Sequence, residues 1–170
     1  MVKLIKTLNR LLTAWPGIFV MGSALAANAA ETQNYSFQFD LLQDKQHAVI
    51  LDYWYGNSRA DRWIWSPDEF VKEGKTYTSE NVFGAMLPGE ALYVKWRITD
   101  TRKVYEDTVD LRHRMPKNIE SHTIYLMIKG PQLYVYLVSP ERRSPNMPNN
   151  GPSMYAYRKV LTIYPDQTKP

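Results

Sequence analysis

Cysteine is absent from this 170-residue chain. The absence excludes disulfide bonds, thiolate metal sites and a cysteine nucleophile. It also excludes the acylated cysteine by which an exported lipoprotein is anchored to a membrane. If the chain is exported, its fold must therefore rest on the packing of its core alone.

The motifs of nucleotide binding and of common catalytic sites are also lacking. The sequence contains no GxGxxG run, no Walker pattern and no GxSxG elbow. Its three histidines, His47, His113 and His122, do not have the spacing of metal ligands. We therefore expect no metal, no cofactor and no catalytic residues, which predicts a protein that is not an enzyme.

One group of polar residues leaves a catalytic interpretation open. Asp110 and His113 flank Arg112 and could supply an acid and the group that orients it. Glu106 and Asp110 share one face of a predicted strand, and a pair of carboxylates is what a glycosidase needs. The opposing interpretation is a solvent-exposed acidic face on a strand whose other face is apolar.

The N-terminal stretch has the three parts of a secretory signal. A basic start is followed by an apolar middle that ends near Leu25, and small residues occupy positions 27–29. This pattern predicts a signal peptide over residues 1–29, cleaved before Ala30. A retained membrane anchor is not expected, because Pro16 and Gly17 interrupt an apolar run shorter than the roughly 20 residues that span a bilayer.

Positive and negative charges nearly cancel outside this stretch. The whole chain carries 21 Lys and Arg against 17 Asp and Glu. Removing Lys3, Lys6 and Arg10 with the predicted signal peptide leaves 18 basic residues against 17 acidic ones, a net charge of +1. A nearly neutral exported protein is not expected to bind nucleic acid through a basic surface.

Short strands are the main predicted element, because apolar and polar residues alternate along most of the chain. Residues 92–98 and 104–111 predict one antiparallel hairpin, and residues 123–128 and 133–138 predict a second. Further strands are predicted at residues 35–39, 48–55, 76–83 and 157–164. The sequence thus predicts one mainly β domain over residues 30–170, an antiparallel β-sandwich or open barrel of seven to eight short strands.

A short helical turn is predicted at residues 67–72. Ser66 is a suitable N-cap and Pro67 fits the first helical position. Asp68 and Glu69 suit the positive end of the helix dipole. The stretch just before this turn, residues 59–67, is expected to be irregular.

The aromatic stretch over residues 53–65 is the first candidate surface for binding a partner. Its members Arg59, Arg62, Trp63 and Trp65 have the residue types that are frequent at interface hot spots. Strand alternation places Trp54 toward the core. The opposing interpretation is that the remaining rings are core residues as well.

Two further candidate surfaces lie toward the C-terminus. Tyr134 and Tyr136 share one strand face, and they form an amphipathic patch if the opposite face is the core. Residues 139–154 form a predicted Pro-rich loop, because prolines lack the amide donors that a strand ladder needs. Arg142 and Arg143 in this loop are candidate partner contacts, and a disordered connection is the alternative.

Three runs of the sequence carry a resemblance to a known group of proteins. They are residues 89–97, residues 104–111 and residues 130–137. In these runs the chain resembles small exported proteins of proteobacteria, many of which are encoded next to type VI secretion effectors, often phospholipases, and act as their periplasmic immunity proteins. The resemblance extends from about residue 51 to residue 164.

The resemblance implies a function without assigning residues to it. It implies a soluble periplasmic immunity protein whose partner is a cognate toxic effector, and a phospholipase is the effector class that it favours. Many members of the group are lipoproteins, whereas this chain has no cysteine to acylate. The alternative is a periplasmic carbohydrate- or envelope-binding module that uses exposed Trp and Tyr rings as stacking platforms.

Overall fold

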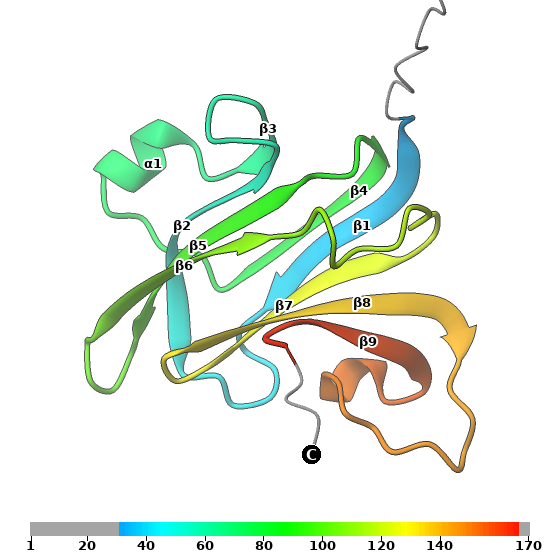
Figure 1. Cartoon of the computed structure of the whole chain (residues 1–170). Coiled ribbons are helices and arrows are strands. Elements are labelled where there is room, and N and C mark those ends of the chain that lie inside the picture. Colours follow the sequence, from blue (N-terminus) through cyan, green and yellow to red (C-terminus); the bar gives the residue numbers. More distant parts are fainter. Residues whose placement is uncertain (1–30, 167–170) are drawn as a thin grey trace, which may run out of the picture.

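The computed structural model describes residues 31–166, which form two β-sheets with one short α-helix and one 3-10 turn (Figure 1). In chain order the elements are β1 (Gln33–Asp40), β2 (Ala48–Gly56), β3 (Arg62–Trp65), α1 (Asp68–Lys72), β4 (Ser79–Met86), β5 (Ala91–Ile98), β6 (Val104–Asp110), β7 (Thr123–Lys129), β8 (Gln132–Arg142), η1 (Ser153–Tyr155) and β9 (Arg158–Tyr164). The predicted signal peptide, residues 1–29, lies outside the described residues. Within residues 31–166, no helix reaches the length and hydropathy of a membrane span.

The strands form a five-stranded sheet and a four-stranded sheet. The first, sheet A, has the order β4-β1-β7-β8-β9, and the second, sheet B, has the order β3-β2-β5-β6. Both predicted hairpins are confirmed, since β5 pairs with β6 and β7 pairs with β8, each in antiparallel register. The prediction of a mainly β fold is confirmed as well.

Two features of the strand arrangement differ from the prediction. The described residues contain nine strands, and the additional one is β3, a four-residue strand inside the stretch that was expected to be irregular. It is too short to show an alternation of its own. In addition, β1 lies parallel to β7, with Ser36 beside Thr123, so sheet A is mixed and not purely antiparallel.

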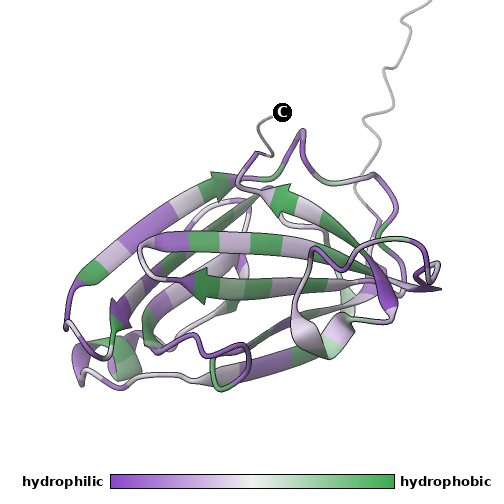
Figure 2. Cartoon of the chain, turned by 90° about the horizontal axis from the view of Figure 1, so that it is seen from below, coloured by the Kyte–Doolittle hydropathy of each residue, from purple (hydrophilic) through white to green (hydrophobic). Residues whose placement is uncertain are grey.

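The core lies between the inner faces of the two sheets. Along β1 the buried residues are Tyr35, Phe37 and Phe39, and their rings meet the rings of Tyr53 and Tyr55 from β2. The Phe37 and Tyr55 ring centres are 5.5 Å apart. Figure 2 shows the corresponding alternation of polar and apolar positions along the strands. Rings packed in this way supply much of the area that stabilises a fold without disulfides.

The inward placement of Trp54 was wrong. The pairing of β2 with β5 shifts register between Ile50 and Asp52, which marks a β-bulge at Leu51. The extra residue moves the following side chains to the opposite faces. Consequently Tyr53 and Tyr55 are buried, and Trp54 lies on the outer face of sheet B.

The predicted helical turn is confirmed as α1, but its cap differs from the prediction. The residue before the first helical position is Pro67, and no side chain caps the helix. The Ser66 hydroxyl instead accepts a hydrogen bond from the Tyr53 amide at 2.9 Å. Ser66 therefore fastens the start of this segment to β2, and α1 lies at the edge of sheet B beside β3 (Figure 1).

The predicted loop boundary at residue 139 was also wrong, because β8 continues through Pro140 to Arg142. Pairing of β8 with β7 ends at Val138, and pairing with β9 is irregular between Val138 and Arg142. Pro140 therefore lies in a stretch without regular strand pairing, where no backbone N–H is needed for a hydrogen bond. The chain then folds back as residues 143–157, here called the strap, which contains η1.

Candidate functional site

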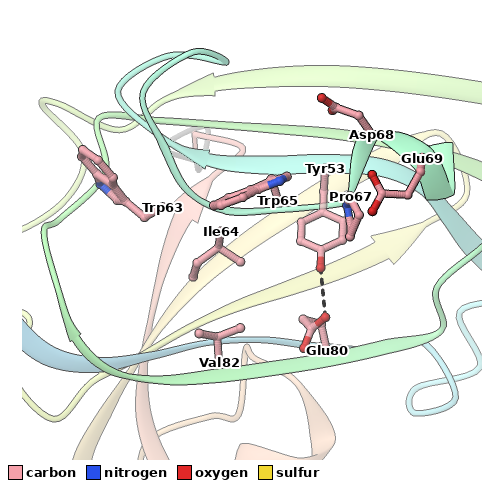
Figure 3. Close-up of a pocket in the computed structure, with 9 residues that line it drawn as sticks. All are labelled: Tyr53, Trp63, Ile64, Trp65, Pro67, Asp68, Glu69, Glu80 and Val82. Carbon is pink, nitrogen blue, oxygen red and sulfur yellow. Dashed lines mark hydrogen bonds between the residues drawn. The ribbon is translucent and has the colours of Figure 1, made fainter. Parts of the chain in front are cut away.

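A pocket of about 560 Å³ opens between the edge strands of the two sheets, β3 in sheet B and β4 in sheet A (Figure 3). Its lining comes from β2 (Tyr53), β3 (Trp63, Ile64, Trp65), the start of α1 (Pro67, Asp68, Glu69) and β4 (Glu80, Val82). The walls thus combine aromatic rings with three carboxylates. None of these lining residues is a Lys or an Arg.

One hydrogen bond spans the pocket from one sheet to the other. The Tyr53 hydroxyl donates to Glu80 Oε2 at 3.0 Å. The Tyr53 amide donates to the Ser66 hydroxyl, which helps to position the phenol that binds the glutamate. Burial, and after it the neighbouring Glu80 charge, raises the pKa of Tyr53 well above its usual range. The phenol is therefore a neutral donor at physiological pH.

Trp65 forms the exposed rim of the pocket, and Arg62 fixes its position. The Trp65 side chain is 43% exposed. The Arg62 guanidinium lies 5.1 Å from the centre of the Trp65 ring and donates to both carboxylate oxygens of Asp68 at 3.2 Å. Arg62 thus contacts both Asp68 and the Trp65 ring, which favours this position of the ring.

Trp63 forms the deeper part of the same wall. Its side chain is half-buried and packs against the main core. The indole Nε1 is buried and has no hydrogen-bond partner among the described residues. A buried donor without an acceptor costs about 1–3 kcal/mol, so the position of Trp63 is maintained by its packing and not by a hydrogen bond.

Arg59 lies near these residues but has a different role. Its Nη1 donates to Asp52 Oδ2 at 3.0 Å, and the Asp52 side chain is only 9% exposed. Next to this ion pair, the Trp54 and Tyr93 rings stack on the outer face of sheet B with centres 6.2 Å apart. Burial, together with the hydrogen bond to Glu106, raises the pKa of Tyr93 to about 12.

The other four predicted contacts lie along β8 of sheet A or directly after it. Tyr134 and Tyr136 do share a strand face, and their rings stack 6.1 Å apart. Tyr136 is only 3% exposed, however, because the strap covers that face and Tyr155 joins a second small core there. Tyr136 therefore offers no surface to a partner, and the predicted amphipathic patch is reduced to the partly exposed Tyr134.

Arg142 and Arg143 differ in exposure. Arg143 donates from Nε to the Ala156 carbonyl at 2.9 Å and from its amide to the Tyr157 carbonyl, so it closes the strap. Arg142 is exposed at the end of β8. The structure thus brings Arg62, Trp63 and Trp65 together, places Arg59 beside them, and separates Arg142 and Arg143 from that group.

Glu69, Glu80 and Val82 are pocket residues that the sequence did not single out. Glu69 was assigned to the helix dipole, and Glu80 and Val82 lay in a weakly patterned strand. The approach of Glu80 and Val82 to Trp65 depends on how β4 of one sheet faces β3 of the other. No local pattern carries that information.

The residues of the catalytic interpretation do not converge on a pocket of this kind. Glu106 accepts from the Tyr93 hydroxyl and lies 3.7 Å from Lys95. Asp110 is bound by Arg112, whose hydrogen bonds hold the pKa of that carboxyl well below its usual range. His113 is exposed. Within residues 31–166, no group of three or more His, Asp or Glu side chains is arranged to hold a metal ion.

Comparison with protein-family models, with curated proteins and with solved structures finds no match to this chain. The geometry of the pocket and of its Trp65 rim is therefore what supports a functional proposal. That geometry is suited to binding, because it offers fixed aromatic surfaces beside carboxylates at an open edge of the sandwich.

Proposed function

We propose that the exported chain is a periplasmic immunity protein that binds a toxic type VI secretion effector, a phospholipase, and blocks the entrance to its active site. The chain itself performs no chemistry. The effector class comes from the sequence resemblance. The binding surface is the group Arg62, Trp63 and Trp65 together with the pocket beneath it, called here the Trp65 site.

The observation that carries the proposal is the pairing of an exposed Trp65 ring, contacted by the Arg62 guanidinium, with an adjoining pocket. Tryptophan and arginine dominate interface hot spots, and such residues act best when they are already ordered before the partner arrives. Arg62 is ordered by Asp68, and Trp65 by Arg62. The edge strands β3 and β4 supply the rigid support.

Occlusion follows from the shape of this surface. The Trp65 rim protrudes where a partner surface can pack around it, and the pocket can receive a side chain from that partner. Specific interfaces bury about 1,600 Å² in total, so the contact would extend beyond the site onto neighbouring surface. The stacked Trp54 and Tyr93 rings on the outer face of sheet B are available for that extension.

The carboxylates considered for catalysis already have neighbouring partners, which supports a role without catalysis. The carboxylates of Glu106 and Asp110 are engaged by neighbouring basic or phenolic groups, and both lie on the exposed face of β6. A general acid or base needs a perturbed pKa near neutrality and a place beside the substrate. The pKa of Asp110 is shifted in the opposite direction, away from neutrality.

The proposal is tested by co-expression with the product of the adjacent gene in the periplasm. We expect the two chains to co-purify as a complex and the host cells to survive expression of the effector. A Trp65→Ala variant should lose most of this capture. Tyr157→Ala removes a ring that is 82% exposed in the strap region and should retain it. Absence of both complex and protection would rule the proposal out.

A carbohydrate- or envelope-binding module is the second candidate, because an exposed Trp65 ring next to carboxylates is also suited to stacking on a sugar. Such modules use several coplanar exposed rings. Among the described Trp and Tyr residues, only Trp65 and Tyr157 are exposed, and they belong to different regions. Sedimentation with purified peptidoglycan separates the candidates, since only the module is expected to bind it.

A further inference from the structure

The carboxylates of the Trp65 site are incompletely neutralised. Asp68 is paired with Arg62. Glu80 accepts from the Tyr53 hydroxyl and from the Asn81 amide, both of which are neutral groups. Among the described residues, neither Glu69 nor Glu80 forms an ion pair. The pocket therefore holds two negative charges that no cation within residues 31–166 balances by direct contact.

The charge of Glu80 acts on the pocket residue Tyr53, and both glutamates act on Tyr77, which packs against Tyr53 without lining the pocket. The pKa of Tyr77, a ring that packs against Tyr53 and Phe70, is raised by burial first and then by Glu80, Asp52 and Glu69. The pKa of Tyr53 is raised by burial and by Glu80. A negative potential that opposes ionisation of a phenol attracts a cation to the same space.

The aromatic wall is suited to a flat or alkylated cation. Arg62 already places a guanidinium over the Trp65 ring, at 5.1 Å from its centre. Trp65 lines the pocket and Arg62 does not, so this guanidinium leaves the pocket itself without a cation. Tryptophan is the best aromatic partner for such a cation, worth about 0.5–2 kcal/mol.

We propose that the pocket of the Trp65 site binds a basic side chain, an arginine or a lysine, that the effector inserts between β3 and β4. Glu69 and Glu80 supply the charge, and Trp65 supplies the surface on which the cation packs (Figure 3). The proposal rests on the proposed function for the identity of the partner. The chemistry of the pocket can be tested without that partner.

The probe is ethylguanidinium chloride, which carries the end of an arginine side chain, and the reference is ethylurea, which has nearly the same shape without the charge. Each is titrated into the mature protein at constant chloride concentration. The indole N–H signals of Trp63 and Trp65 are followed by NMR, with Trp65→Phe used to assign them. We expect a saturable shift of these signals with ethylguanidinium and none with ethylurea.

The charge requirement is tested with Glu69→Gln, Glu80→Gln and the double variant. The amide introduced by Glu80→Gln keeps an acceptor oxygen for Tyr53, and the Glu69 side chain forms no hydrogen bond among the described residues, so the fold should persist. We expect the double variant to bind ethylguanidinium about fivefold more weakly. Glu90→Gln, which changes an exposed glutamate outside this pocket, is the matched control and should bind as the wild type does.

Equal responses to ethylguanidinium and ethylurea would overturn this inference, and so would unchanged binding by the double variant. Failure of the cation pocket and failure of the proposed function give different results. A protein that captures the effector but ignores ethylguanidinium retains the proposed function and loses the cation pocket. A protein that binds ethylguanidinium but captures no effector retains the pocket and loses the function.

Discussion

Tyr53 and Glu80 join the two sheets across the open edge of the sandwich, through a hydrogen bond of 3.0 Å from the phenol to the carboxylate. Tyr53 belongs to an interior strand of sheet B, whereas Glu80 belongs to the edge strand β4 of sheet A. The bond fixes the distance between these strands at the pocket. The other oxygen of Glu80, Oε1, accepts from the Asn81 amide at 3.0 Å, so the carboxylate is held on both sides by neutral donors.

The raised pKa of Tyr53 predicts a loss of stability at high pH. The folded-state pKa lies above the unfolded value of 10.0, so the unfolded state releases its proton first as pH rises past 10. This contribution to stability is fully present below pH 10 and declines above it. Tyr53→Phe should make the fall in unfolding free energy shallower by about 1.4 kcal/mol per pH unit.

Urea denaturation between neutral pH and pH 11 measures this difference. Tyr35 and Tyr125 also have pKa values raised by burial, so the variant should still lose stability in alkali, only less steeply. At neutral pH the variant should lose about 1 kcal/mol with the hydrogen bond to Glu80. Identical alkaline slopes for the two proteins would contradict the role assigned to the phenol.

Removal of Arg59 should destabilise the fold, because it leaves the Asp52 carboxylate buried and unpaired. Only 9% of the Asp52 side chain is exposed, and Arg59 is the cation that contacts it. We expect Arg59→Ala to cost about 1–3 kcal/mol of unfolding free energy. Arg112→Ala, which breaks a pair whose members are both about half exposed, should cost clearly less, because solvent screens such a pair. Equal costs in urea denaturation would show that burial of Asp52 does not matter.

Gly89 is required by a close approach, not by its backbone angles. A Cβ at this position would lie 2.8 Å from two ring carbons of Tyr55 and 3.0 Å from the Gly56 amide nitrogen. The Gly89 amide also donates to the Tyr55 hydroxyl at 2.6 Å. Gly89→Ala should therefore lower the free energy of unfolding by about 1–3 kcal/mol through overpacking.

A double-mutant cycle locates the cause of that loss. In a Tyr55→Leu background, where the ring is gone, Gly89→Ala should cost clearly less, because only the 3.0 Å approach to the Gly56 amide nitrogen remains. Thermal melts of the four proteins give the coupling between the two sites. A cost of Gly89→Ala that persists unchanged without the Tyr55 ring would contradict the steric explanation.

The strap should open without unfolding the sheets when Tyr155 is removed. The Tyr155 ring packs edge-on against Tyr125 at 5.4 Å, and its hydroxyl donates to Gln38 Oε1 at 2.6 Å. Tyr155→Ala should increase amide hydrogen exchange over residues 143–157 and leave exchange in β5 unchanged. Tyr155→Phe, which keeps the ring, should show a smaller increase. Equal protection of the strap in all three proteins would contradict this.

The sequence predicted what local alternation determines. The hairpins β5–β6 and β7–β8 follow from neighbouring residues, and both were predicted correctly. The bulge at Leu51 has no comparable signal, so Trp54 was placed on the wrong face. The parallel pairing of β1 with β7 joins segments more than 80 residues apart, as Ser36 and Thr123 show. Alternation predicts that a segment is a strand, but not which other strand it pairs with.

The candidate site was predicted only in part for the same reason. Residue types at hot spots pointed to Arg62, Trp63 and Trp65, which lie close together on one short stretch. Glu80 reaches them from the other sheet, so no spacing in the sequence relates it to Trp65. Tyr136 shows the converse, because its strand pattern predicted an exposed ring and a distant segment, the strap, covers it.

Inhibition of the effector tests the central proposal most directly. The phospholipase activity of the adjacent gene's product is measured while the mature chain is added, with wild type, Trp65→Ala and Tyr157→Ala in parallel. We predict that wild type and Tyr157→Ala abolish the activity at one equivalent, whereas Trp65→Ala leaves most of it. Full activity in the presence of excess wild-type chain would contradict the proposal.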